Sequence, residues 1–224
     1  MCLAQYIKYF NEINKKAIMK YIKRLELFNT HSYVNESNNI VDKYNWPSMP
    51  IDIHSLSLEE MSKMFGYIQW KKGSGDKIIV TNNFIKENIM DIELPQLAKI
   101  KNPPRTFRIK CHKLAVVPIL RLWEEWEKAG LLNRIERWHG CHNARVQRKS
   151  INLLSNHAWG TAFDINKETN DLGQIPPAVG QRGSVRELVP IANKLGFFWG
   201  GHFSKRLDGM HFELSTLGDR QIIL

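Results

Sequence analysis

The feature that most constrains the fold is an amphipathic segment, residues 114–129, which lies between short apolar stretches. Its apolar residues include Leu122, Trp123 and Trp126, and they recur at helical spacing to give one broad apolar face. Gly130 follows directly, and glycine is common just beyond a helix end. The segment therefore predicts a helix that ends at Ala129.

Short apolar stretches elsewhere predict strands. The expected strands are 77–81, 107–113, 135–138, 161–166, 197–199 and 210–214. Two Ser-x-x-Glu patterns, Ser57–Glu60 and Ser184–Glu187, are typical of capping boxes, so they predict helices that run to Met64 and to Gly196. Helices and strands mix without a regular β-α-β rhythm, and no internal repeat is visible. The sequence therefore predicts an α+β fold with an antiparallel sheet.

The charge is strongly basic and unevenly distributed. Among 224 residues, 32 are Lys or Arg and 22 are Asp or Glu, which gives a net charge of +10. Residues 101–150 hold twelve basic and four acidic residues and so contribute +8. Such a segment favours a polyanionic partner, either nucleic acid or an anionic cell wall, although a solvated basic face gives the same pattern.

The remaining composition excludes several classes of protein. No stretch of about 18 apolar residues occurs, so we expect no membrane-spanning helix. The N-terminus lacks the apolar core of about 7–15 residues that a signal peptide needs. The three cysteines, Cys2, Cys111 and Cys141, are too few and odd in number for a disulfide scaffold, so a reduced state is expected. The apolar residues of the segment 4–27 recur at roughly helical spacing. The segment 29–45 is rich in Asn, Ser and charged residues, so we expect it to be a linker.

Two stretches carry candidate chemistry, residues 154–166 and 197–214. His157 and Asp164 are separated by Gly160, where a turn can bring the second side chain back beside the first. His211 is expected on a strand, three residues after Asp208. Two His and one Asp suit a Zn²⁺ site with one position left for water, and a nearby carboxylate can accept a proton from that water.

Spacing alone leaves other interpretations of the same residues open. A random His–Asp pair is more often a structural hydrogen bond than a metal site. A Ser155–His157–Asp164 triad lacks a nucleophile-elbow motif, and the His-Glu-x-x-His motif of thermolysin-like enzymes is absent. A second site from Cys111, His112, His139 and Cys141 does not have the usual zinc-module spacing.

Both stretches resemble motifs of a known peptidase family. Residues 155–166, SNHAWGTAFDIN, resemble the Ser-x-His-x-x-Gly-x-Ala-x-Asp motif of the VanY-like zinc D-alanyl-D-alanine carboxypeptidases. That family also includes L-alanyl-D-glutamate endopeptidases of phage endolysins. Residues 199–213, WGGHFSKRLDGMHFE, resemble its second motif, Trp-Gly-Gly followed by Asp-x-x-His-Phe-Glu. The resemblance covers residues 105–214.

The resemblance implies a role for individual residues. His157, Asp164 and His211 match the family's zinc ligands, and Asp208 matches its general base. The carboxypeptidase and dipeptidase branches commonly have Glu at that position, so Asp208 is closer to the endopeptidase branch. The family also has an arginine upstream of the first motif that faces the substrate. Arg145 is the closest match, and Arg148 is its rival.

The resemblance further implies a zinc metallopeptidase that hydrolyses the peptidoglycan stem peptide, as an L-Ala-D-Glu endopeptidase or a D-Ala-D-Ala carboxypeptidase. It implies a small antiparallel sheet that carries the zinc site between helices, as in the Hedgehog/D-Ala-D-Ala peptidase-like fold. We therefore expect a catalytic domain at 105–224, an accessory segment packed on it at 51–104, and a helical region with a linker at 1–50.

The expected place of action is the cell wall, after synthesis in the cytoplasm, as for a phage or bacterial lysin. The basic segment 101–150 would then contact the anionic wall. Two alternatives are a zinc-containing binding module without catalysis and a basic nucleic-acid-binding protein. The presence of Asp208 argues against the first, and the lack of a recognised nucleic-acid-binding module argues against the second.

Overall fold

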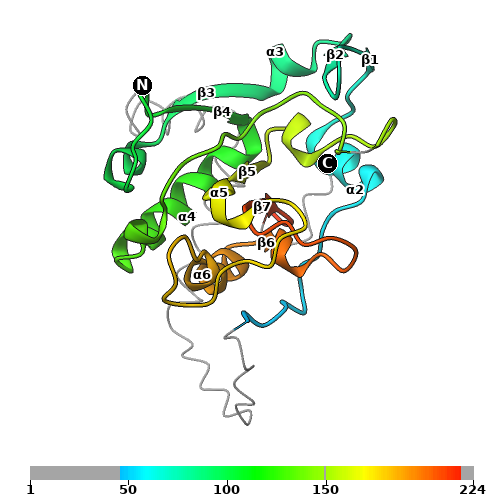
Figure 1. The fold of residues 1–224 in the computed structure, drawn as a ribbon. Coiled ribbons are helices and arrows are strands. Elements are labelled where there is room, and N and C mark those ends of the chain that lie inside the picture. Colours follow the sequence, from blue (N-terminus) through cyan, green and yellow to red (C-terminus); the bar gives the residue numbers. More distant parts are fainter. Residues whose placement is uncertain (1–45, 149, 218–224) are drawn as a thin grey trace.

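The structure, a computed structural model, describes residues 46–148 and 150–217 (Figure 1). Its α-helices are α2 (Leu58–Phe65), α3 (Phe84–Asn88), α4 (Val116–Lys128), α5 (Lys167–Asn170) and α6 (Val189–Lys194). Its strands are β1 (Trp70–Lys72), β2 (Ile78–Val80), β3 (Ile89–Glu93), β4 (Arg108–His112), β5 (Ala162–Asp164), β6 (Phe197–Trp199) and β7 (His211–Leu214). The helix and linker expected before residue 46 lie outside the described residues.

The strands form three small antiparallel sheets, β1–β2, β3–β4 and β5–β7–β6. The predicted α+β fold with antiparallel sheets is therefore confirmed. In Figure 1 the three-stranded sheet lies near the centre of the molecule, beside α4 and α6, which contact each other. None of the helices in the described part of the chain has the length and hydropathy needed to cross a membrane.

The three-stranded sheet has one apolar and one polar face, because successive side chains of a strand point to opposite sides. Phe163 and Phe212 pair across β5 and β7, and the Trp126 ring of α4 lies 6.0 and 5.6 Å from them. Asp164 and His211 form the adjacent register pair. Their side chains therefore emerge on the face opposite α4, where the candidate site lies.

Helix α4 follows the prediction closely. Its first expected residues form a 3₁₀ turn instead, Lys113–Ala115, in which the Leu114 N–H donates to His112 Nδ1 at 3.1 Å. The helix ends at Lys128, and Gly130 has a left-handed backbone with φ of 69°. Its buried face packs on the sheet through Trp123 and Trp126.

The predicted strand at 135–138 is wrong. In this segment Trp138 makes a single isolated bridge with Ile165. The backbone N–H groups of Glu136 and Arg137 donate instead to Asn166 Oδ1, at 2.6 and 3.2 Å. Asn166 Nδ2 also donates to the Arg134 carbonyl at 2.8 Å. One buried amide side chain thus takes the hydrogen bonds that a neighbouring strand would otherwise receive.

The two predicted capping boxes have different outcomes. Ser57 and Glu60 form both reciprocal hydrogen bonds at the start of α2, as expected. In the second case Ser184 Oγ donates to Glu187 Oε2 at 2.6 Å, and a 3₁₀ turn at Arg186–Leu188 precedes α6. The second pattern therefore stabilises a loop before the helix, and the α-helix itself begins at Val189.

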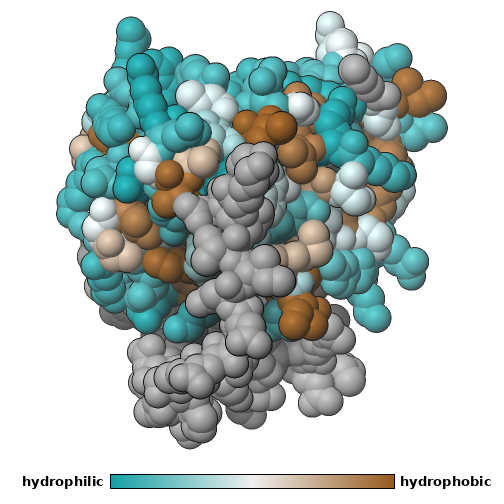
Figure 2. All heavy atoms as spheres, turned by 60° about the horizontal axis from the view of Figure 1, so that its bottom comes forward, coloured by the Kyte–Doolittle hydropathy of each residue, from teal (hydrophilic) through white to brown (hydrophobic). Residues whose placement is uncertain are grey.

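One hydrophobic core extends from Leu56 to Leu214. On the face drawn in Figure 2, hydrophobic residues lie in separate small groups among hydrophilic ones. Strands β3 and β4 pair over five residues across the expected boundary between residues 104 and 105. His112 on β4 also donates from Nε2 to the Phe65 carbonyl at 2.9 Å, which ties α2 to the rest of the chain. The division into domains stays a prediction.

Candidate metal centre and cleft

A tight turn brings the first two candidate residues together. His157 lies in a 3₁₀ turn, Asn156–Ala158, and Asp164 ends β5. Between them Gly160 has φ of 70°, and a Cβ there would lie 2.8 Å from the His112 backbone nitrogen. Only glycine therefore suits this position without displacement of β4.

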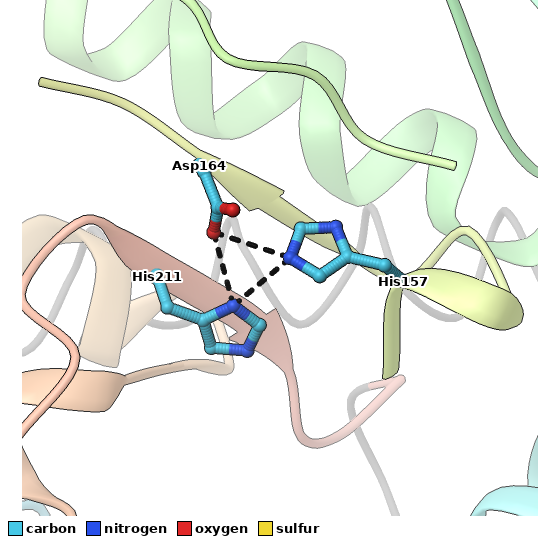
Figure 3. A group of neighbouring side chains, drawn as sticks. All are labelled: His157, Asp164 and His211. Carbon is cyan, nitrogen blue, oxygen red and sulfur yellow. Dashed lines mark hydrogen bonds and ion pairs between the residues drawn. The ribbon is translucent and has the colours of Figure 1, made fainter. Parts of the chain in front are cut away.

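The three candidate ligands converge at one point (Figure 3). His157 Nε2 lies 3.1 Å from Asp164 Oδ1 and 3.2 Å from His211 Nδ1. His211 Nδ1 lies 3.1 Å from the same Asp164 oxygen. Among the described residues these side chains form a group that can hold a metal ion. The sequence named all three.

The outward hydrogen bonds of the histidines fit a metal ion at this point. His157 Nδ1 lies 2.7 Å from the Cys141 carbonyl, which can only accept, so the ring proton is on Nδ1. His211 Nε2 likewise donates to Glu213 Oε2 at 2.9 Å. When both rings are neutral, the nitrogens that face Asp164 therefore present lone pairs. Three electron-rich atoms about 3 Å apart repel one another unless a positive charge lies among them.

The pKa values of the group point the same way. Burial would raise the pKa of Asp164, but the charges and hydrogen bonds of His157 and His211 outweigh it and hold the pKa well below its usual range. Burial would lower the pKa of His211, but hydrogen bonds with Asp164 and Glu213 raise it to about 10. The carboxylate is thus ionised at neutral pH, and the site favours a positive charge, either a proton or a metal ion.

Asp208 lies beside this group and is held by its backbone. Its N–H donates to the Gly200 carbonyl at 2.9 Å, and its carbonyl accepts from the His211 N–H at 3.1 Å. A Cβ on Gly200 would lie 2.5 Å from the Asp208 carbonyl oxygen, so glycine permits this close approach. Burial, with the charge of Asp164, raises the pKa of Asp208 to about 6. Its Oδ1 is buried without a hydrogen-bond partner in the described part of the chain.

A cleft of about 590 Å³ opens over this polar face. Asp208, His211 and Glu213 line it together with Ser155 and Asn156. Both candidate arginines, Arg145 and Arg148, line it as well. The cleft therefore contains a possible metal ligand, a carboxylate with a raised pKa and positively charged side chains.

Part of the chain is similar to a known protein family. A family model described as D-alanyl-D-alanine carboxypeptidase matches residues 148–214. The resemblance predicted from the two motifs is confirmed. Comparisons with curated proteins and with solved structures gave no match.

The segment that matches the carboxypeptidase family holds the whole candidate centre. His157, Asp164, Asp208 and His211 all fall within it, whereas Arg145 lies three residues before it. The two arginines also differ in contacts. Arg148 forms an ion pair with Asp171 at 3.6 Å, and its charge lowers the pKa of Asp208 against the effect of burial. The Arg145 guanidinium donates to the Val146 carbonyl at 3.2 Å.

Several side chains near the two carboxypeptidase motifs are structural. Trp159 is buried and donates to the Gly66 carbonyl at 2.8 Å, and Trp199 is buried and donates to the Gly209 carbonyl at 2.8 Å. Both tryptophans belong to the core. Glu213 is only 2% exposed, and its carboxylate lies against His211 and Asn156.

The alternative chemistries are not supported by the geometry. Both ring nitrogens of His157 are engaged by Cys141 and by the other two candidate ligands, which leaves none for Ser155. His112 and His139 bond to Phe65 and Glu168 respectively, and Cys111 and Cys141 are free thiols. Within the described residues, these cysteines and histidines do not form a metal-binding group. His202 donates to the Pro47 carbonyl at 2.8 Å.

Sequence reasoning missed part of the site. Asn156 Nδ2 donates to Glu213 Oε2 at 2.6 Å, so the residue before one candidate ligand supports the residue that orients another. The position of Asn156 next to His157 in the first motif is the sequence feature that could have indicated this role. Lys205 and Arg206 also line the cleft. They lie inside the second motif but outside its characteristic positions, so no local pattern indicated them.

Proposed function

We propose that the protein is a zinc-dependent peptidase that hydrolyses peptide bonds in the stem peptide of bacterial peptidoglycan. His157, Asp164 and His211 would hold the metal, and Asp208 would be the general base. The cell wall would be the place of action. The convergence of three ligand atoms within 3.2 Å of one another, beside Asp208 and inside the family match, carries this proposal.

The donor set suits zinc in particular. Two imidazole nitrogens and one carboxylate oxygen are typical ligands of Zn²⁺ in metallopeptidases. A Zn²⁺ bound there would polarise the scissile carbonyl and acidify a water. The Cys141 carbonyl and Glu213 would keep the two imidazoles in the required tautomer and orientation.

The chain's own residues would then move the proton. The Asp208 carboxylate would accept a proton from the attacking water and pass it to the leaving amine. Its pKa of about 6 suits both steps near neutral pH, because the group is mostly ionised and still readily protonated. Arg145 or Arg148 would bind the substrate carbonyl oxygen or a substrate carboxylate.

The products of a peptidoglycan digestion would identify the bond that the protein cleaves. Asp208, where carboxypeptidase branches commonly have Glu, favours the L-Ala-D-Glu endopeptidase type. Mass spectrometry of purified peptidoglycan after digestion decides this. Free D-alanine would identify a carboxypeptidase, and fragments with a new N-terminal D-glutamate would identify the endopeptidase. The absence of any peptide cleavage by zinc-loaded protein would overturn the proposal.

Metal analysis tests the ligand set. His157→Ala should hold markedly less than one zinc per chain and should lose hydrolysis. His54→Ala is a matched control, because its side chain is 59% exposed and contacts Glu60 away from the candidate ligands. One full equivalent of zinc in the His157 variant would remove this residue from the site.

A further inference from the structure

The cleft is lined by four positively charged side chains from two separate segments. Arg145 and Arg148 belong to residues 145–148, here called the first arm. Lys205 and Arg206 belong to residues 203–207, here called the second arm. Asp208 and Glu213 are the carboxylates that line the same cleft. The surface around the candidate centre is thus predominantly basic.

The second arm is anchored at both ends. Phe203 lies with its ring 5.9 Å from Phe198 and 5.9 Å from His211. The Leu207 carbonyl accepts from the Gly173 N–H at 2.7 Å. The arms meet where Arg206 Nη2 donates to the Arg148 carbonyl at 3.4 Å. These contacts hold the backbone that carries Lys205 and Arg206 beside the cleft.

The cleft differs from the segment 101–137 in how its charges are paired. Most basic side chains of the segment 101–137 face a carboxylate, as in the pairs Lys101–Glu136, Arg108–Asp91 and Arg137–Glu168. Within the described part of the chain, Arg145, Lys205 and Arg206 have no such ion-pair partner. Unpaired cations in a cleft concentrate a positive potential there and attract anionic ligands.

The shape of the cleft favours a short ligand. Its volume of about 590 Å³ is in the range of small-ligand pockets. Leu56, Leu172 and Phe203 lie among its lining residues and offer apolar contacts to aliphatic side chains. A long polyphosphate would instead need an extended basic track over the surface. A short acidic peptide therefore matches the lining best.

We infer that the cleft recognises its substrate by at least two carboxylates of the peptide, one bound by Arg145 in the first arm and one by Lys205 and Arg206 in the second. The inference rests on the proposed peptidase function. It adds a substrate class, peptides that carry two or more free carboxylates, and a specificity role for the second arm.

Two forms of one stem peptide test this inference, one with free carboxylates and one with those groups converted to primary amides. Binding is measured by calorimetry in the Asp208→Asn background, so that the peptide is not consumed. The free acid should bind about tenfold more tightly than the amide at low salt. This preference should shrink as salt rises.

The variants locate the effect. Lys205→Gln with Arg206→Gln should reduce the preference to about threefold or less. Lys63→Gln with Lys194→Gln removes the same number of charges from exposed positions on α2 and α6, so it should keep the full preference. Zinc content should be unchanged in both double variants.

Three results would overturn the inference. They are equal binding of the acid and amide peptides, an unchanged preference in the second-arm variant, and tighter binding of a DNA oligonucleotide or a polyphosphate than of the acidic peptide. If the protein prefers the free acid but cleaves no peptide, the proposed peptidase function is contradicted. The inference about the cleft is then still supported.

Discussion

At the scale of single residues, hydrogen bonds on the outer side of the two imidazole rings orient the candidate metal ligands. The Cys141 carbonyl accepts the proton of His157 Nδ1, and Glu213 accepts the proton of His211 Nε2. Asn156 in turn donates to Glu213 at 2.6 Å, so the two motifs are joined through this hydrogen bond. With both rings neutral, the three inward atoms are therefore all electron-pair donors, which is the property that a metal site requires.

Asp208→Asn tests the division between binding and catalysis. The variant should keep its zinc and lose hydrolysis by roughly 10²–10⁴-fold, because an amide cannot accept the proton. In the native protein, activity should fall as the pH drops through about 6, where the carboxylate becomes protonated. Steady-state rates between pH 5 and 8 measure both effects. Turnover close to that of the native protein in the variant would assign the base to another residue, with Glu213 the next candidate.

Conservative replacement separates the two candidate arginines. Arg145→Lys should lower kcat/KM at every salt concentration if Arg145 grips the substrate, because lysine lacks the planar fork that makes two parallel hydrogen bonds. Arg148→Lys should have the smaller effect, because Arg148 is already paired with Asp171. Rates at low and high salt provide the measurement. A silent Arg145→Lys beside an impaired Arg148→Lys would exchange the two roles.

The sequence predicted the residues of the centre more fully than those of the cleft. His157, Asp164, Asp208 and His211 could be named because they match the characteristic positions of the two motifs that the sequence resembles. Lys205 could not, because a single lysine in a loop is ordinary on any surface and its place beside the cleft depends on the folded chain.

At the scale of secondary structure, the turn at Gly160 fixes the distance between the first two candidate ligands. Gly160→Ala should destabilise the protein by about 2–4 kcal/mol, since it combines a left-handed backbone with a clash against the backbone of β4. Gly130→Ala is the matched control. Its φ of 69° is nearly the same, but no atom lies within 4 Å of the added Cβ, so about 1–2 kcal/mol is expected. Urea unfolding of both variants measures the difference, and equal losses would rule out the clash.

Elements with a strong periodic pattern were predicted well, and elements held by side chains were not. Helix α4 and strands β4, β5 and β7 lie within two residues of their predicted bounds, because their apolar patterns match the faces that they bury. The segment 135–138 was also predicted to be a strand, yet Asn166 accepts hydrogen bonds from its backbone. A contact between residues about thirty positions apart leaves no trace in local sequence.

At the scale of the whole molecule, His112 links parts of the chain that are distant in sequence. It is 1% exposed, its Nε2 donates to the Phe65 carbonyl at the end of α2, and its Nδ1 accepts from the Leu114 N–H. These two bonds require the neutral ring. Burial lowers the pKa of His112 to about 4, and the bond to Phe65 opposes this only in part. Protonation of this one side chain is therefore coupled to unfolding of the core.

The global stability should consequently fall on acidification in a defined window. Because the pKa of His112 is about 6.5 when unfolded and about 4 when folded, the unfolded chain binds the extra proton between these values. The stabilising contribution is complete above pH 6.5 and is lost as the pH falls toward 4. This loss of stability amounts to about 2–3 kcal/mol between pH 7 and pH 4.5.

Other buried groups titrate nearby, so the comparison with His112→Gln isolates this effect. The variant should be less stable at pH 7, since glutamine cannot replace both hydrogen bonds, but its free energy of unfolding should decline by about 2–3 kcal/mol less over the same interval. Urea unfolding of zinc-loaded protein at both pH values measures the two slopes, and parallel slopes would mean that His112 is not the group whose protonation unfolds the core.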